Sequence, residues 1–371
     1  MKKSVVLWAP FRGAVGTRQA VIATANVLSK NERVIIFQLV DEWEPYRVEF
    51  DSKVEFETIF KHKFFRHIGR SNTFHRRDFF LLSIVAIPLL AFQLRRYKAD
   101  KLIAMLLVAP IILASTKLTK TSLYISVQGS PAFLLDSYKS RNIYFRLENL
   151  VREKLWYFLY RKAECVFCMS DITTDKIKQR FHQKFSNVVT LRNPLFSATQ
   201  QVVEKKPCFG SNFIFVGRDS HQKNFSLALE FFASIDSEYK SLTVYGDFNG
   251  MTVNDSRIRF AGYTENLWQE EDVKGSIHLV TSRWEDPGHA ILEGLAAQVP
   301  TLIIGNSSDF HFIYASYQVP IYGCSADAAK FLVECNEVYT DSYLRQVSEM
   351  VASDYSIESY SKNLRDLLCL A

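Results

Sequence analysis

The alternation of short apolar runs with longer segments of helical periodicity constrains the fold more than any other feature of this chain. The first run is Ser-Val-Val-Leu-Trp-Ala at residues 4–9. Further strands are expected at 33–39, 123–127, 165–169, 187–191, 213–216, 242–245, 257–260, 278–280 and 301–304. Strands that alternate with helices build parallel sheets with helices packed on their faces. The sequence therefore predicts an α/β protein.

The length of 371 residues points to two domains, because a single hydrophobic core rarely serves a chain of this size. Residues 197–207 are polar and without periodicity, and they follow an Asn193-Pro194 pair. We therefore expect one domain at 1–196 and a second at 197–355. The apolar residues of 356–371 follow helical spacing, which predicts a C-terminal helix. Other helices are expected at 17–29 and 142–162, and another should begin after an N-cap at Ser170. In the second domain, one helix should end near residue 235, and others are expected near 266 and 290.

Positive charge is concentrated in one stretch. Residues 61–101 hold ten Lys or Arg and two acidic residues. The net positive charge of this stretch alone therefore exceeds the net charge of +6 of the whole chain. Within it, residues 79–92 form an apolar run interrupted by Pro88, shorter than the roughly 20 residues of a spanning helix. We expect a buried or interfacial helix here. The stretch favours an anionic membrane surface over nucleic acid, because no nucleic-acid-binding motif accompanies the charges.

Two other features have simple structural interpretations. The apolar N-terminal run is too short for a secretory signal and ends at Pro10, so we interpret it as a buried strand. Cys165 and Cys168 are separated by two residues within an apolar run, and no second cysteine pair completes a zinc site. We expect them to be buried strand residues.

Residues 281–300 contain the pattern that says most about function. An apolar strand is followed by Glu285-Asp-Pro-Gly288 and then by a helix that carries Glu293. Pro287 suits a first helical turn, and Gly288 lets a ligand approach the backbone. The free amides of a helix N-terminus bind anions such as phosphate. A carboxylate at Glu293, about 7.5 Å further along the axis, could then accept from ribose hydroxyls.

A second pattern lies at residues 215–224, again between a strand and a helix. Arg218 and Lys223 follow the strand and would project from the carboxyl edge of the sheet, where open α/β folds bind ligands. Two cations that converge on a diphosphate can stabilise it as a leaving group.

Together these patterns resemble the retaining glycosyltransferases of the GT-B fold, specifically glycosyltransferase family 4. The resemblance is specific over residues 212–305. It implies two Rossmann-like domains facing a cleft, with the C-terminal helix packing back on the N-terminal domain. It also implies that Arg218 and Lys223 bind the donor diphosphate, that Glu285 lies at the donor sugar, and that Glu293 binds the ribose. On this basis the catalytic residues would be Glu285, Arg218 and Lys223.

The resemblance extends to further positions. Donor-binding residues would also include Gly13, Gly16, Gly217, Gly262, Tyr263, Pro287, Gly288, His289 and Ala290. Where the family often has an aromatic-Gly pair after the first Glu, this chain has Asp286-Pro287-Gly288-His289. Where the family often has His-Gly in the N-terminal domain, this chain has Gln128, which can bind a hydroxyl of the acceptor or donor sugar but cannot act as a base.

No Asp-x-Asp sequence occurs, and the histidines lack the i, i+4 pairing of a metal site. We therefore expect no metal and no cofactor beyond the nucleotide-diphosphate sugar, which is a co-substrate. Cations and a helix dipole would stabilise the diphosphate instead.

The sequence thus predicts a metal-independent, retaining glycosyltransferase that transfers a hexose to a glycan acceptor. The expected setting is surface polysaccharide or lipopolysaccharide synthesis with a lipid-linked acceptor, in the cytoplasm or on the inner face of the cell membrane. Two alternatives remain open. One is a nucleotide-sugar epimerase or hydrolase on the same fold, and the other is a non-catalytic nucleotide-sugar-binding subunit.

Overall fold

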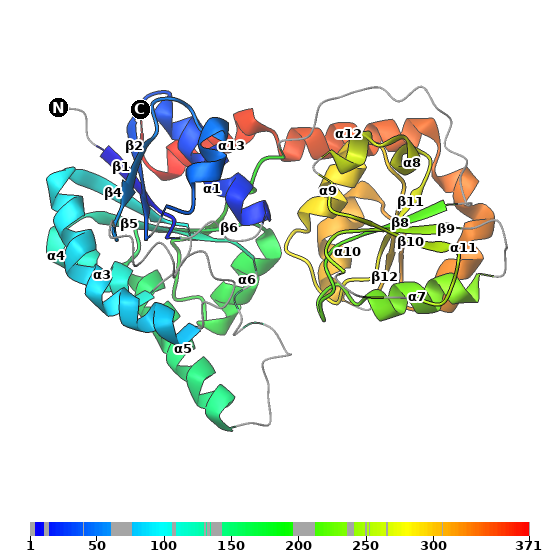
Figure 1. Cartoon of the computed structure of the whole chain (residues 1–371), viewed down its shortest axis with the longest axis horizontal. Helices are drawn as coiled ribbons and strands as arrows, with labels where there is room; N and C mark the ends of the chain where they lie inside the picture. The colour runs from blue at the N-terminus through cyan, green and yellow to red at the C-terminus, as the bar shows by residue number, and fades with distance from the viewer. Residues whose placement is uncertain are drawn as a thin grey trace. The chain divides into compact units, whose positions relative to one another are not determined.

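The computed structural model describes residues 4–10, 15–39, 41–60, 76–105, 109–129, 131, 134, 143–195, 212–235, 241–248, 251, 253–264, 266–305 and 307–370. The chain divides into two compact units (Figure 1). The first comprises Met1–Pro194 together with Ile357–Ala371, and the second comprises Leu195–Ser356.

The first unit is built on a seven-stranded parallel sheet with strand order β3-β2-β1-β4-β5-β6-β7. Its strands are β1 (Ser4–Trp8), β2 (Arg33–Gln38), β3 (Glu55–Thr58), β4 (Ala99–Ala104), β5 (Ser122–Val127), β6 (Cys165–Cys168) and β7 (Val188–Thr190). Its helices are α1 (Val15–Ser29), a 3₁₀ helix (Glu44–Glu49), α3 (Arg76–Arg96), α4 (Ala109–Thr119), α5 (Ile143–Lys162), α6 (Asp171–Arg180) and α13 (Ile357–Leu367).

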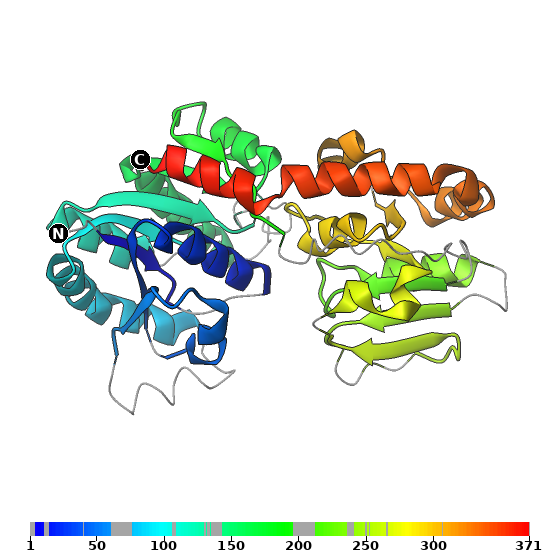
Figure 2. The same ribbon diagram turned by 90° about the horizontal axis from the view of Figure 1, so that it is seen from above.

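Alternate residues of the central strands supply two hydrophobic cores, one on each face of this sheet. Val6 and Trp8 of β1 pack with Leu90 of α3 and Ile112 of α4. Leu7, on the opposite face, packs in the core that contains residues of α1 and α13. Figures 1 and 2 show the same division, with α3, α4 and α5 on one side of the sheet and α1 and α13 on the other. Burial on both faces explains why strands such as β1, β2 and β6 read as nearly continuous apolar runs.

The second unit contains a six-stranded parallel sheet with strand order β10-β9-β8-β11-β12-β13. Its strands are β8 (Asn212–Val216), β9 (Ser241–Tyr245), β10 (Ile258–Gly262), β11 (Ile277–Val280), β12 (Thr301–Ile304) and β13 (Ile321–Tyr322). Its α-helices are α7 (Phe225–Ser234), α8 (Glu271–Lys274), α9 (His289–Ala296), α10 (Ser308–Tyr314), α11 (Ser325–Val338) and α12 (Asp341–Asp354). Short 3₁₀ helices span Leu267–Gln269 and Ala315–Tyr317.

The predicted fold class is confirmed, since two parallel sheets form two Rossmann-like units. Each expected strand is present, and residues 79–92 lie within helix α3 as expected. Ser170 caps α6 by accepting a hydrogen bond from the amide of Thr173 (3.2 Å). The structure adds β3, β4, β13, α4, α10, α11 and α12, which the sequence patterns did not predict.

Cys165 and Cys168 are buried free thiols on β6, as expected. Burial raises the pKa of Cys165 to about 11, so its thiol stays protonated at neutral pH. Among the residues that the structure describes, no helix combines the length and the hydropathy needed to cross a bilayer.

Helix α13 packs on α1 of the first unit, which confirms that the C-terminal helix returns to the N-terminal domain. Leu364 and Leu368 of this tail are buried in the same core as Val21 and Leu28 of α1. The buried hydroxyls of Tyr360 and Thr24 are 2.7 Å apart, and Thr24 also donates to the carbonyl of Ala20 (2.6 Å). The Tyr360 hydroxyl therefore donates to Thr24.

This contact predicts how α13 stabilises the first unit. Leu364→Ala should lower its free energy of unfolding by about 2–5 kcal/mol, because a fully buried leucine is removed. Tyr360→Phe should lower it by about 1 kcal/mol, the value of one net hydrogen bond. Lys362→Ala, an exposed change on the same helix, is the control. Denaturant unfolding followed by circular dichroism measures each value, and equal stability of Leu364→Ala and Lys362→Ala would contradict the packing.

Candidate functional site

The second unit places its two sequence motifs side by side. Strands β8 and β11 are neighbours in the sheet, with Phe213 opposite Ile277. From β8 the chain proceeds to β9 and β10 on one side, whereas β11 leads to β12 and β13 on the other. Such a reversal of strand order is where open α/β sheets bind ligands, outside the carboxyl ends of the strands. The loops at 217–224 and 281–288 both begin at this edge.

Glycines allow the strand ends beside this point to approach closely. Gly246 has φ +130°, and a Cβ there would lie 1.6 Å from the carbonyl oxygen of Gly217, so no other residue fits. The amide of Gly217 donates to Tyr245 (2.9 Å), and the amide of Gly246 donates to Gly262 (2.8 Å). Backbone hydrogen bonds therefore connect the carboxyl ends of β8, β9 and β10.

A buried ion pair connects the two loops. Lys223 Nζ donates to Glu285 Oε1 (2.6 Å), and Ser282 Oγ donates to the same oxygen (2.7 Å). The side chain of Glu285 is 6% exposed and that of Lys223 is 19% exposed. The hydroxyl of Thr281 donates to the carbonyls of Lys223 and Asn224. Residues separated by about sixty positions are thus held together by paired charges and hydrogen bonds.

Helix α9 begins immediately after this pair. Its N-cap is Gly288, with φ +87°, and the carbonyl of Gly288 accepts from the amides of Ile291 (2.9 Å) and Leu292 (3.2 Å). A glycine cap has no side-chain acceptor, so the amides of His289 and Ala290 are available to an anion. Pro287 was expected in the first helical turn, but it precedes the cap, and its carbonyl accepts from the buried hydroxyl of Tyr314. The positive φ of Gly288 is what turns the chain into the helix.

The first residue of this helix is electrostatically unusual. Both ring nitrogens of His289 are shielded from solvent and have no hydrogen-bond partner among the described residues. Burial lowers the pKa of His289 to about 4, although the nearby Glu285 opposes this shift. The imidazole is therefore neutral at pH 7, with one donor and one acceptor nitrogen. Buried nitrogens without hydrogen-bond partners are rare in native proteins, and a ligand could supply the missing hydrogen bonds.

Glu293 lies one turn further along α9. Its Oε2 accepts from the indole nitrogen of Trp268 (3.2 Å), and burial raises the pKa of its carboxyl group above the usual value. The Trp268 ring lies over Gly294, where a Cβ would come within 2.9 Å of the indole, and packs at 5.3 Å from the ring of buried His278. Trp268 was not predicted from the sequence to be part of this site. A glycine inside a helix, next to the second motif glutamate, was the available signal for such a close contact.

Two predicted donor-binding residues lie apart from this hydrogen-bonded group. Arg218 is exposed, and within the described ranges it forms no hydrogen bond or ion pair. Tyr263 follows the Gly262 strand end, which has φ +77°, and its side chain is 62% exposed. Their roles stay predictions.

In the first unit, Gln128 follows β5 at the carboxyl edge of the sheet, and both the oxygen and the nitrogen of its side-chain amide are hydrogen-bonded. Asn193 Nδ2 donates to Gln128 Oε1 (2.8 Å), and Gln128 Nε2 donates to Ser126 Oγ (2.5 Å). Gly16 lies in the first turn of α1. Gly13, the other glycine predicted to bind the donor, falls outside the described residues.

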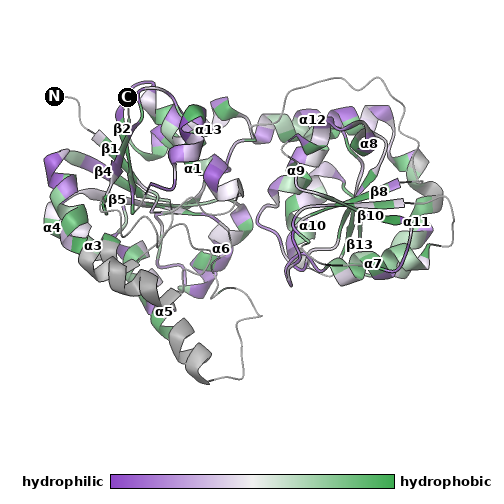
Figure 3. Ribbon diagram, in the orientation of Figure 1, coloured by the Kyte–Doolittle hydropathy of each residue, from purple (hydrophilic) through white to green (hydrophobic). Residues whose placement is uncertain are grey.

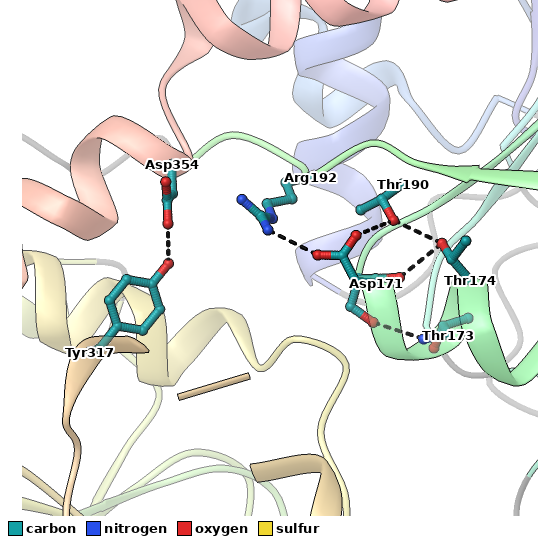
Figure 4. A network of polar contacts seen from close by, with 8 residues as sticks. Asp171, Thr173, Thr174, Thr190, Arg192, Tyr317 and Asp354 are labelled. Atoms are coloured by element: carbon teal, nitrogen blue, oxygen red, sulfur yellow. Dashed lines mark hydrogen bonds and ion pairs between the residues drawn. The ribbon is translucent and has the colours of Figure 1, made fainter. Parts of the chain in front are cut away.

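A second polar group lies at the same edge of the first unit. Asp171, the first residue of α6, accepts from the hydroxyl of Thr190 (2.6 Å) and from Arg192 (2.9 Å), as Figure 4 shows. These bonds fix α6 against the end of β7. Figure 4 also shows a bond of the second unit, in which the Tyr317 hydroxyl donates to Asp354 (2.6 Å). No cluster of three His, Cys, Asp or Glu side chains suited to a metal ion is found in the described part of the chain.

The environment of His289 predicts a pH dependence of stability. The unfolded chain binds a proton near pH 6.5 and the folded imidazole only near pH 4, so the free energy of unfolding should fall as the pH falls between these values. Buried His278, whose pKa is lowered to about 3, adds to the same trend. His289→Gln should reduce this loss, and exposed His311→Gln is the control. The measurement is denaturant unfolding across this pH range, and identical slopes for the wild type and His289→Gln would refute the assignment.

No protein-family model and no curated protein sequence matches this chain. Solved structures do match over nearly the whole chain. Anabaena HepE, crystallised with UDP-glucose, has a TM-score of 0.71 at 12% identity and covers 99% of each chain. Sucrose-phosphate synthase from Thermosynechococcus elongatus has a TM-score of 0.71 at 13% identity and covers 99% of this chain and 98% of its own.

The lipopolysaccharide outer core galactosyltransferase WaaB also matches, with a TM-score of 0.62 at 15% identity over 99% of each chain. At these identities a match indicates the fold alone. The expected architecture is confirmed: the chain has the GT-B fold of two Rossmann-like domains.

Proposed function

We propose that the chain is a retaining glycosyltransferase that uses a nucleotide-diphosphate sugar. The observation that carries the proposal is the Lys223–Glu285 pair beside the N-terminus of α9, at the point where the strand order of the second sheet reverses. A cation and free helix amides at one place suit a diphosphate. A carboxylate held against that cation suits the sugar attached to it.

The donor would bind with its diphosphate between Lys223 and the amides of His289 and Ala290. As the bond from the sugar to the diphosphate breaks, negative charge develops on the phosphate oxygens. The fixed ammonium group and the helix N-terminus stabilise that charge. Arg218, which is exposed and unpaired within the described ranges, can reorient to add a second cation.

The two motif carboxylates would have different tasks. Glu285 already accepts from Lys223 and Ser282, so its orientation is fixed before any ligand binds, and it would position the donor sugar. Glu293 has one oxygen bonded to Trp268, and its other oxygen would accept from the ribose hydroxyls. The strand ends at Gly262 and Tyr263 would face the base. HepE was crystallised with UDP-glucose, which makes UDP-sugars the first donors to test.

The acceptor would be a glycan bound by the first unit. Gln128 is held by Asn193 and Ser126 and would orient a sugar hydroxyl of the acceptor or the donor. A lipid-linked glycan of surface polysaccharide synthesis, handled on the cytoplasmic side of the membrane, is the acceptor that we propose.

Conservative substitutions separate the proposed roles. Lys223→Gln should weaken the binding of a nucleoside diphosphate by about 1.5–3 kcal/mol, because a charged hydrogen bond is lost while Glu285 keeps a donor. Glu293→Gln should weaken nucleotide binding as well. Glu285→Gln should leave nucleotide affinity nearly unchanged but lower turnover. Lys330→Gln, an exposed change on α11, is the control.

Isothermal titration calorimetry with UDP, GDP, ADP and dTDP measures these affinities, and turnover is measured with the matching nucleotide sugar. Unchanged affinity in both Lys223→Gln and Glu293→Gln would contradict the donor site. Tight nucleotide-sugar binding with neither transfer nor hydrolysis would instead indicate a non-catalytic binding subunit.

The chemistry of the site also predicts independence from divalent metals. Lys223 and the α9 amides supply positive charge at the place where a metal would neutralise the diphosphate in other enzymes. Sugar transfer should therefore persist in excess EDTA. Activity that disappears with EDTA and returns with added Mg²⁺ or Mn²⁺ would overturn this view of phosphate binding.

A further inference from the structure

Three neighbouring helices of the first unit end at adjacent strands. Helices α3, α4 and α5 lead into β4, β5 and β6, which are neighbours in the parallel sheet. Helices α3 and α4 pack together, as do α4 and α5, on one face of the sheet (Figure 1). The C-terminal turns of the three helices therefore lie next to one another at the amino edge of these strands.

Each of these helix ends combines an exposed apolar side chain with two cations. On α3, Phe92 is 62% exposed and is followed three and four residues later by exposed Arg95 and Arg96. On α5 the same spacing recurs, where Phe158 is 53% exposed and precedes exposed Arg161 and Lys162. Side chains at i, i+3 and i+4 share one face of a helix, so each phenylalanine lies beside its cations.

Helix α4 contributes a similar group between the other two. Leu118 is 54% exposed, and Lys117 and Lys120 beside it are exposed. A side-chain nitrogen of Arg95 donates to the carbonyl of Leu118 (2.8 Å), which joins the ends of α3 and α4. Leu89 of α3 and Leu150 and Val151 of α5 extend the exposed apolar surface toward the helix N-termini. Figure 3 shows hydrophobic and hydrophilic residues interspersed along the described parts of these helices.

Cations outnumber acidic residues at this surface, where exposed Glu164 follows α5 and Asp100 at the start of β4 lies 3.6 Å from Lys101. Among the described side chains of α3, α4 and α5, Glu153 is the one acid, and it forms a bidentate ion pair with Arg180 of α6 (2.6 and 2.8 Å). Cations in a last turn favour the helix dipole, and that effect alone accounts for basic helix ends. It does not account for exposed phenylalanine and leucine beside them on three successive helices.

We infer that the surface formed by Leu89, Phe92, Arg95, Arg96, Lys117, Leu118, Lys120, Phe158, Arg161 and Lys162 docks on an anionic lipid bilayer. The cations meet the lipid headgroups, and the phenylalanine and leucine side chains enter the interface below them. Nucleic acid suits the surface less well, because Leu89 and Leu118 cannot stack on bases and leave Phe92 and Phe158 as the aromatic side chains. This surface differs from the one expected from residues 61–101, because four of its six cations, Lys117, Lys120, Arg161 and Lys162, lie outside that stretch. The inference does not depend on the donor chemistry of the second unit.

Two matched quadruple variants test the inference. In the first, Arg95, Arg96, Arg161 and Lys162 become serine. In the second, four exposed cations elsewhere become serine, which removes the same charge: Lys184, Lys330, Arg345 and Lys362. Affinity is measured by co-sedimentation with vesicles of phosphatidylcholine, with and without phosphatidylglycerol, at several salt concentrations. Since each cation near an anionic surface strengthens binding about five-fold, the first variant should lose more than about 20-fold in affinity. The control should bind like the wild type.

Wild-type binding should require phosphatidylglycerol and weaken with salt. Phe92→Ser with Phe158→Ser should lower the affinity while keeping the salt dependence. Equal loss in both quadruple variants, equal binding to neutral vesicles, or tighter binding to a single-stranded oligonucleotide than to anionic vesicles would overturn the inference. Nucleoside diphosphate affinity, measured on the same quadruple variants, reports on the second unit separately and also shows that each variant is folded.

Discussion

The ion pair between Lys223 and Glu285 is the interaction on which the candidate site depends. Both side chains are largely removed from water, where an unpaired charge would be strongly unfavourable. The pair forms only if β8 and β11 lie next to each other, because the two residues follow these strands. Removal of one partner alone would leave a buried charge and destabilise the unit by about 3–5 kcal/mol. The same contact therefore specifies strand order and assembles the site.

Several polar groups around this pair are held in place but have unused hydrogen-bonding capacity. The amides of His289 and Ala290 precede the first intrahelical donor of α9, and the ring nitrogens of His289 are buried without partners among the described residues. One oxygen of Glu293 is bonded to Trp268, and its pKa is raised by burial. Groups of this kind reduce the stability of the free protein. They are what a ligand with phosphates and hydroxyls would satisfy, without further reorganisation of the site.

The sequence predicted the strands that contain a recognisable apolar run and missed those that do not. Strands such as β1 and β6 are almost continuous apolar runs, because helices cover both faces of the sheet. Strand β3 is the polar edge segment Glu-Phe-Glu-Thr, and β13 has two residues, so neither carries a recognisable pattern. Strand β4 begins Ala-Asp-Lys within the basic stretch, where the charges concealed its apolar second half.

The residues of the candidate site also divide into those that the sequence predicted and those that it did not. Local motifs indicated Lys223, Glu285, Gly288 and Glu293, because each lies in a strand–loop–helix segment that can be recognised from the local sequence. Trp268 bonds to Glu293 and Thr281 bonds to the backbone of Lys223, but only the folded chain brings these groups into range. Pairing between residues distant in sequence is a property of the sheet topology, which no local pattern contains. The row of exposed phenylalanines and cations on α3 and α5 has the same origin, since it exists only because β4, β5 and β6 are neighbours.

Hydrogen exchange at the start of α9 tests the central claim most directly. The amides of His289 and Ala290 have no intrahelical acceptor, so they should exchange quickly in the free protein. Addition of a nucleoside diphosphate should slow exchange in a peptide that covers residues 285–293, while α12 remains unchanged. This result is predicted if the helix N-terminus and Lys223 hold the diphosphate. Nucleotide binding that leaves the exchange of residues 285–293 unaltered would contradict the account.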